Sequence, residues 1–480
     1  MDFISRRDLA FMLNDWLNVK ELTEREAFAE HSPATFEQVM DLSADMARDV
    51  FAPHCKAADI HEPKLVDGKV ETLPEIADAL KQYAEAGFFS VAFPEENGGL
   101  NLPMVVAAAS YSHFAAANIS TSGYAMLTGG SARLIAEHGS QKQIKTWAEP
   151  AIEGRYFGTM CLSEPQAGSS LSDTLTQANP DGEDEYGLRY KVRGNKMWIS
   201  GGDQEISENI VHLVLAKAPD DEGVQHKGVR GLSLFIVPKY LPDGAHNDVV
   251  VAGLNHKMGF RGTVNTLLNF GEQGGATGWR VGGAGQGLAI MFQMMNEARI
   301  MVGLGAAALA YRGMVQSTQY ATERPQGRPL GAKKGADIPQ VPIIEHADVR
   351  RMLIMQKAFA EGGLALCLYS AKLFDDEKTA PTPEARKEAA ALLDLLTPIT
   401  KSWPSEFGLV ANDQAIQVHG GYGYTREYDV EQLYRALVQA CQRHEQLGWL
   451  TRSRGFCAGQ LIMRMGEPAA GGPVSAFIGG

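Results

Sequence analysis

The stretch Met160-Cys-Leu-Ser-Glu-Pro-Gln-Ala-Gly-Ser-Ser170 decides the fold assignment of this chain. Its first residues are typical of a strand, and the Pro, Gly and Ser residues that follow predict a loop. In such a loop, backbone N–H groups and hydroxyls can face a ligand instead of a neighbouring strand. The same chemistry also fits an ordinary strand-to-turn connection, so the meaning of the stretch depends on its surroundings.

The residue pattern around this stretch is typical of a β domain. Short segments rich in β-branched and aromatic residues, each bounded by turn residues, are expected at 190–193, 196–200, 210–215, 232–237 and 263–270. The acidic stretch 179–185 is expected to be an exposed loop between two strands. A middle β domain is therefore predicted over residues 156–280.

Helical periodicity dominates on both sides of the β domain. Apolar residues recur at helical spacing from Phe36 to Phe51, after Pro33 and a Thr35-x-x-Gln38 capping box, and a second helix is expected from Pro74 to Gly87. Beyond Gly287, three long helices are expected, the later two near 349–374 and 383–418. The predicted fold is α+β, with an N-terminal helical domain (1–155), the β domain (156–280), a C-terminal helical bundle (281–435) and a tail (436–480).

Composition excludes several classes of protein. The chain has 480 residues, 45% of them hydrophobic, and a formal net charge of -13, so it lacks the basic excess that binding to nucleic-acid phosphates requires. Five scattered cysteines without a C-x-x-C pair suggest neither a disulfide framework nor a metal site. No clean signal peptide is visible, and the apolar run 300–310 is too short to span a bilayer. A cytoplasmic protein is expected.

Taken in order, six segments resemble signatures of the acyl-CoA dehydrogenase family, which implies that family's fold and its cofactor FAD. Residues 160–170 are similar to the family's first flavin-contacting signature, and Gly194-Asn-Lys-Met-Trp-Ile-Ser-Gly201 looks like its second flavin strand. Four further segments continue the series: 257–263, 296–299, 323–328 and 417–428. The resemblance covers roughly residues 35 to 435 and is strongest for the branch of larger dehydrogenases that includes the 3-methylmercaptopropionyl-CoA type.

The resemblance implies a set of flavin contacts whose residue types suit the cofactor. An isoalloxazine ring is flat and mostly apolar with hydrogen-bonding atoms along one edge, so it needs an aromatic neighbour, backbone N–H groups and hydroxyls. Trp198 could otherwise be a core residue, and Arg324 a solvated helix end. The candidate FAD-binding residues are Met160, Leu162, Ser163, Ser169, Trp198, Ser200, Arg324, Gln417, Gly420 and Gly421.

Relatives use the last four of these positions across a subunit boundary, so the resemblance implies a homodimer or homotetramer. Ser169 and Arg299 are the candidate substrate-binding residues. Arg299 either orients the substrate or braces the opening of the acyl cleft, or it only pairs on the surface, and the residue types alone leave these roles open. His419 and Cys161 are interpreted as structural residues.

The candidate catalytic base is Glu445. Dehydrogenating an acyl thioester requires a base for the α-proton, and a carboxylate in an apolar pocket suits this role because desolvation raises its pKa. In relatives the base follows a Tyr-Arg-Asp element. Here Tyr434-Arg435 is present, but after it only His444-Glu445 is similar to the family pattern, and the additional C-terminal domain of the larger branch is not expected. A change of reading frame and natural divergence both explain such an ending.

The resemblance therefore predicts an FAD-dependent enzyme that converts an acyl-CoA to the 2-enoyl-CoA and passes electrons to electron-transfer flavoprotein. Two alternatives remain: a catalytically impaired flavoprotein with the same fold, and an acyl-CoA oxidase. No nucleic-acid or membrane partner is expected.

Overall fold

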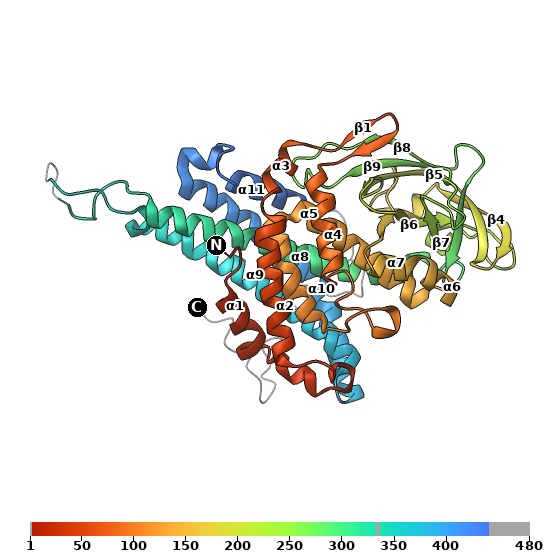
Figure 1. Cartoon of the computed structure of the whole chain (residues 1–480), viewed down its shortest axis with the longest axis horizontal. Coiled ribbons are helices and arrows are strands. Elements are labelled where there is room, and N and C mark those ends of the chain that lie inside the picture. The colour runs from red at the N-terminus through yellow and green to blue at the C-terminus, as the bar shows by residue number, and fades with distance from the viewer. Residues whose placement is uncertain (1, 333–336, 441–480) are drawn as a thin grey trace. The chain divides into compact units, whose positions relative to one another are not determined.

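The computed structural model describes residues 2–332 and 337–440. Its elements follow the order helical, β, helical (Figure 1). The first part consists of seven α-helices and one small hairpin: α1 (Arg6–Ala10), α2 (Pro33–Met46), α3 (Cys55–Ile60), β1 (Lys64–Val66), β2 (Lys69–Glu71), α4 (Pro74–Glu85), α5 (Met104–His138), α6 (Gln141–Gln143) and α7 (Glu149–Ile152).

In this first part, one local prediction was wrong and one element was not predicted. The cap of α2 is Ser32, whose hydroxyl accepts from the Thr35 N–H, because Pro33 already occupies the first helical position. Thr35 is thus the third residue of the helix, and the Thr35-x-x-Gln38 box was wrong. The hairpin β1–β2 was not predicted either. Asp67 and Gly68 connect its strands with positive φ angles of 49° and 77°, which suits a two-residue hairpin turn.

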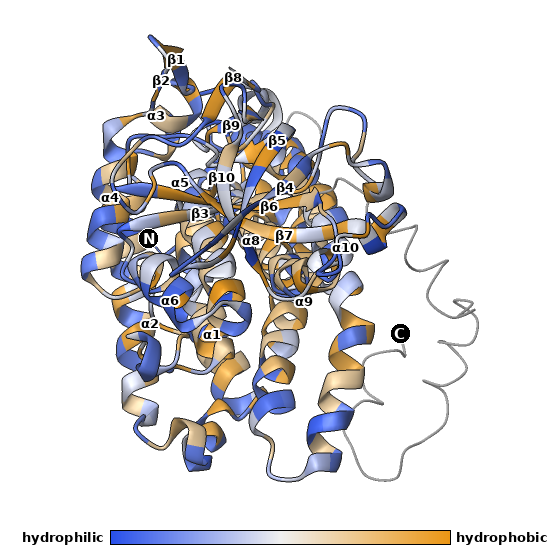
Figure 2. Cartoon of the chain, turned by 90° about the vertical axis from the view of Figure 1, so that its right-hand side faces the viewer, coloured by the Kyte–Doolittle hydropathy of each residue, from blue (hydrophilic) through white to orange (hydrophobic). Residues whose placement is uncertain are grey.

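The middle part is a β-barrel-like sheet. Its strands are β3 (Tyr156–Cys161), β4 (Gln177–Asp184), β5 (Gly187–Ser200), β6 (Asn209–Lys217), β7 (Leu232–Pro238), β8 (Val249–Leu254), β9 (Asn265–Phe270) and β10 (Ala276–Val281). They lie in the order β10-β7-β6-β4-β5-β9-β8, β3 runs parallel to β6, and β10 also pairs with β5, which closes the ring. In Figure 2, apolar colour appears on several of these strands and polar colour on others. The strands β6 and β7 are buried along almost their whole length.

The acidic stretch 179–185 is not the predicted loop. Most of it belongs to β4, which pairs antiparallel with β5 through a bulge between Pro180 and Glu183. The hairpin is exposed on one side, so its residues are polar although the backbone is paired. Charge content therefore indicated exposure correctly and secondary structure wrongly.

The last part is a helical bundle. Its helices are α8 (Gly287–Glu323), α9 (Ala347–Thr379), α10 (Pro383–His419) and α11 (Val430–Ala440). Helices α8 and α10 approach so closely that a Cβ on Gly303 would lie 2.0 Å from the Thr400 carbonyl oxygen. Among the described residues, α8 alone is long and apolar enough to cross a bilayer, but 72% of its most apolar window is buried inside the protein. It is the central helix of the bundle.

The first turn of α5 is held by a residue far away in the chain. The carboxylate of Asp375, in α9, accepts hydrogen bonds from the backbone N–H groups of Met104 and Val105 at 2.7 and 2.9 Å. A helix begins with N–H groups that have no partner within the helix, and here a buried acid satisfies two of them. Burial raises the pKa of Asp375 to about 7, although both N–H groups favour its ionised form.

We expect Asp375→Ala to lower the free energy of unfolding by about 1–3 kcal/mol, because it leaves buried N–H groups unpaired.

The raised pKa of Asp375 means that the folded protein holds a proton more tightly than the unfolded chain. The resulting stability is complete below the unfolded-state pKa and is lost as the pH rises through about 7. Denaturation of wild type and Asp375→Ala at pH 5 and pH 8 should show the larger difference in unfolding free energy at pH 5. Equal differences would mean that the carboxyl is ionised throughout.

Candidate active site

The loop 162–170 is fastened to strand β5 by a buried ion pair. The Lys196 ammonium lies 2.9 Å from the Glu164 carboxylate and donates to the Leu162 carbonyl, also at 2.9 Å. Beside it, the Met197 N–H donates to the Ser163 carbonyl at 2.9 Å. The two segments that the sequence marked as flavin-contacting are therefore brought together.

Glu164 is buried but stays ionised. Burial alone would raise its pKa, but the Lys196 ammonium, the Thr176 hydroxyl and the Leu175 N–H together hold the pKa of Glu164 below its ordinary value. A buried carboxylate with this many donors is a rigid anchor. The loop thus has a fixed place on the sheet.

Trp198 presents its ring at the surface of this loop–strand pair. Its φ of 65° is unusual for a residue with a side chain, and it lies where the register between β5 and β9 shifts. The side chain is 59% exposed, so Trp198 is not a core residue. Two residues on, the Ser200 hydroxyl accepts from the Asn265 amide at 3.1 Å. An open aromatic face beside a hydroxyl and a fixed loop fits a flavin ring.

A cavity of about 110 Å³ lies between α5, the loop 88–93 and the first half of α8. Aromatic residues, methionines and alanines make up most of its lining, and Tyr83, Phe88 and Tyr111 among them are buried. Met160, at the end of β3, also lines it. The cavity and the flavin-type loop are therefore two residues apart along one strand.

Among the residues that the structure describes, Arg133 and Glu297 are the only charged ones that line this cavity. The Arg133 Nε lies 3.1 Å from the Glu297 carboxylate, and both side chains are almost covered, at 14% and 11% exposure. Burial raises the pKa of Glu297 above its ordinary value, against the opposing charge of Arg133. Neither residue was singled out from the sequence. They are 164 residues apart, and only the packing of α5 against α8 joins them.

The remaining cofactor candidates lie elsewhere. Gln417, Gly420 and Gly421 are exposed at the end of α10, and the stacking of Tyr320 on His419, with ring centroids 4.4 Å apart, places them beside the end of α8. Arg324 caps that end and donates to its neighbouring carbonyl. A helix of thirty residues is about 45 Å long. In α8 this length separates Arg324 from Met294, which belongs to the same apolar cluster as Leu162. One chain does not unite these residues with the loop 162–170.

The other predicted residues have separate environments. Arg299 donates to Asn296, one turn earlier in α8, and does not line the cavity, whereas its neighbours Glu297 and Ala298 do. Ser169 is exposed in the loop. Cys161 is fully buried in β3, as expected of a structural residue. Glu445 lies outside the described residues.

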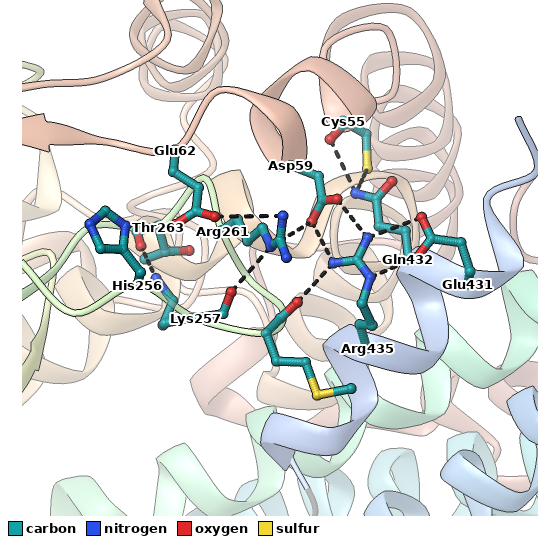
Figure 3. A network of polar contacts seen from close by, with 11 residues as sticks. Cys55, Asp59, Glu62, His256, Lys257, Arg261, Thr263, Glu431, Gln432 and Arg435 are labelled. Carbon is teal, nitrogen blue, oxygen red and sulfur yellow. Dashed lines mark hydrogen bonds and ion pairs between the residues drawn. The ribbon is translucent and has the colours of Figure 1, made fainter. Parts of the chain in front are cut away.

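The chain leading to Glu445 leaves the described structure through a firmly held helix. Arg435 in α11 makes a two-point ion pair with Asp59 at 3.0 and 2.6 Å, a second pair with Glu431, and a hydrogen bond to the Met258 carbonyl (Figure 3). These contacts raise the pKa of Arg435, although burial opposes them. A Cβ on Gly259 would lie 2.5 Å from the Arg435 carbonyl oxygen, so the two backbones touch. Residue 435 is thus fixed against both the first and middle parts.

Comparison with known families accounts for this architecture. Residues 34–155 match the acyl-CoA dehydrogenase N-terminal domain, 159–272 the middle domain and 285–438 the C-terminal domain. The chain belongs to the acyl-CoA dehydrogenase family. Its members are FAD-dependent oxidoreductases, so FAD is the cofactor and the chain is an enzyme. The predicted family, fold class and cofactor are confirmed.

Individual relatives resemble most of this acyl-CoA dehydrogenase. It is 36% identical over 439 residues to 3-methylmercaptopropionyl-CoA dehydrogenase of Ruegeria pomeroyi, covering 89% of this chain and 71% of the relative. A butyryl-CoA dehydrogenase of Syntrophomonas wolfei is 33% identical, with coverage of 96% and 76%.

Solved structures show the same fold. The butyryl-CoA dehydrogenase of Megasphaera elsdenii has a TM-score of 0.68 at 19% identity, covering 89% of this chain and 98% of that one. An acyl-CoA dehydrogenase of Bacillus anthracis in complex with FAD has a TM-score of 0.70 at 23% identity, with coverage of 87% and 65%.

We expect Lys196→Met to release the loop 162–170, because Glu164 would remain buried without its counter-ion. The uncompensated charge should lower the free energy of unfolding by about 3–5 kcal/mol. The purified variant should lose most of its FAD, measured as the ratio of visible to ultraviolet absorbance. Replacing Glu164 by Gln in the same variant should restore part of it.

The control is Arg25→Met, which breaks the pair with Asp376, another largely buried pair at 16% and 17% exposure. It should destabilise the protein without loss of FAD. Full FAD retention in Lys196→Met would show that the pair does not hold the flavin loop.

Proposed function

We propose that this enzyme dehydrogenates a short acyl-CoA to the 2-enoyl-CoA and passes the electrons to electron-transfer flavoprotein in the cytoplasm. The observation that carries the proposal is the position of β3. Met160 lines the cavity, and Leu162 and Ser163 begin the loop beside Trp198. An acyl group in the cavity would therefore lie against a flavin held by this loop.

Different residues of the chain have different roles in the proposed reaction. Met160, Leu162, Ser163, Ser169, Trp198 and Ser200 would hold the flavin ring and its edge, and FAD, when bound, accepts hydride from the β-carbon. Glu445 is the proposed base for the α-proton. It follows Arg435 by ten residues, and the contacts of Arg435 fix the point from which that segment starts.

The size of the cavity supports a short acyl chain. A cavity of about 150 Å³ accommodates a benzene-sized ligand, so the 110 Å³ here suits a chain of about four heavy atoms. Five methionines line it: Met104, Met126, Met160, Met294 and Met301. Thioether side chains are flexible and polarizable, which favours tolerance of branching or of a sulfur atom. Two relatives are named for butyryl and 3-methylmercaptopropionyl substrates, which agrees with this size.

The separation of the two groups of candidates supports a homo-oligomer. Arg324, Gln417, Gly420 and Gly421 would meet the phosphate and nucleotide portion of a flavin held by a neighbouring copy. A planar, permanently charged guanidinium suits a phosphate, and glycines allow the backbone to come close. Arg299 remains a proposed brace of the helix that lines the cavity.

Anaerobic addition of butanoyl-CoA to the purified protein should bleach the visible flavin band, and electron-transfer flavoprotein should restore it. Glu445→Gln should abolish bleaching while FAD remains bound, because the α-proton would have no acceptor. Bound flavin that never bleaches with any chain length would favour a catalytically impaired flavoprotein. Peroxide release in air at the rate of turnover would identify an oxidase instead.

We expect Gly129→Leu to shorten the accepted chain. Gly129 lines the cavity, and a Cβ there would meet no atom within 4 Å, so the added side chain would fill cavity space without a clash. The kcat/KM for hexanoyl-CoA should fall about tenfold more than that for butanoyl-CoA, on the order of one or two buried methylenes. Gly253→Leu, at an equally open position in β8 outside the cavity lining, is the control. An equal loss for both chain lengths would contradict this assignment of the cavity.

A further inference from the structure

Arg133 has hydrogen-bonding capacity that the protein does not use. A guanidinium carries five N–H donors. One, on Nη2, donates to the Ala92 carbonyl at 3.1 Å, and the ring of Phe93 lies 4.7 Å from the guanidinium carbon. The Nε lies 3.1 Å from the Glu297 carboxylate, and no described residue accepts a hydrogen bond from Nη1. The side chain is fixed, yet Nη1 remains available as a donor.

The place of Arg133 in the cavity matches the polar part of a substrate. Apart from Arg133 and Glu297, the described side chains that line the cavity carry no charge, and the buried rings of Tyr83, Phe88 and Phe89 offer largely apolar surface for an alkyl chain. An acyl-CoA is apolar at its acyl end and carries carbonyl oxygens at the thioester and along its pantetheine arm. Bound with its alkyl chain against the apolar lining, it would bring a carbonyl oxygen to Arg133.

The ion pair with Glu297 explains why a neutral acceptor is favoured over an anion. Glu297 balances the charge of Arg133 in a nearly covered site, so an added carboxylate or phosphate would leave one negative charge uncompensated. A carbonyl oxygen adds no charge and can accept from Nη1. The pair therefore supplies an oriented donor for a neutral carbonyl.

We propose that Arg133, held by Glu297, Phe93 and the Ala92 carbonyl, positions acyl-CoA by donating a hydrogen bond to one of its neutral carbonyl oxygens. This inference rests on the proposed function, because it takes acyl-CoA as the ligand of the cavity. Arg133 is a positioning residue in this scheme, and the proton and hydride transfers do not pass through it.

The test compares wild type with Arg133→Gln/Glu297→Gln, which removes both charges and so leaves neither buried alone. We expect the Kd of 2-butenoyl-CoA, an unreactive ligand followed by calorimetry, and the KM of butanoyl-CoA each to rise about tenfold or more. FAD content, the thermal midpoint and kcat should change little. Arg133→Lys should recover binding in part, since it keeps the positive charge but loses the planar set of guanidinium N–H donors.

A matched control is Arg189→Gln/Asp181→Asn, an Arg Nε–carboxylate pair at 3.0 Å in the β4–β5 hairpin, away from the cavity lining. It should leave the Kd unchanged. A butanoyl thioester of N-acetylcysteamine separates the two carbonyl sources: an equal loss locates the contact near the thioester, and a loss for the CoA ester alone locates it further along the arm.

Unchanged Kd and KM for both ligands in the folded, FAD-loaded double variant would overturn the proposal. Because the Kd is measured without turnover, failure to bleach with any acyl-CoA would count against the proposed function and leave the role of Arg133 to the binding result.

Discussion

The ion pair between Arg435 and Asp59 joins all three parts of the chain. Asp59 belongs to a short helix of the first part, Arg435 to the last helix of the bundle, and the Met258 carbonyl that Arg435 also binds belongs to the β domain. A guanidinium can hold three acceptors at once because its donors form a rigid planar fork. Removing either partner would break the two-point pair and leave the other only its weaker or local partner, Glu431 for Arg435 and Arg261 for Asp59. The Arg435 network thus ties the three parts together at one point (Figure 3).

Within that frame, strand β3 couples the two halves of the site. Its parallel pairing with β6, in register from Tyr156 to Cys161, fixes where the strand ends. The Lys196–Glu164 pair then fixes the direction of the loop that follows. An acyl chain and a flavin must lie within bond-making distance for hydride transfer. Rigid attachment of both proposed binding surfaces to one strand would meet this requirement.

Local motifs predicted much of this arrangement, and long-range packing supplied the rest. The loop at 162–170, the strand with Trp198 and the helical–β–helical order could be predicted because each depends on neighbouring residues in the sequence. Arg133 and Glu297 could not, since each looks like an ordinary charged helical residue until α5 packs on α8. The strand at 179–184 was missed because an exposed hairpin has no apolar alternation. The separation of Arg324 from the flavin loop follows from the length of α8, which the sequence indicated only as a helical period.

The clamp of Asp375 on the first turn of α5 also bears on how the chain is made. Its two acceptor bonds link residues 271 and 270 positions apart. A ribosome adds about 5–20 residues per second, so the start of α5 emerges roughly 15–50 s before the acid that caps it. During that interval the first backbone N–H groups of α5 lack the carboxylate of Asp375 as their acceptor. Nascent chains of this protein therefore pass through a period in which α5 can pack on earlier elements such as α2 and α4 while its first turn still lacks this cap.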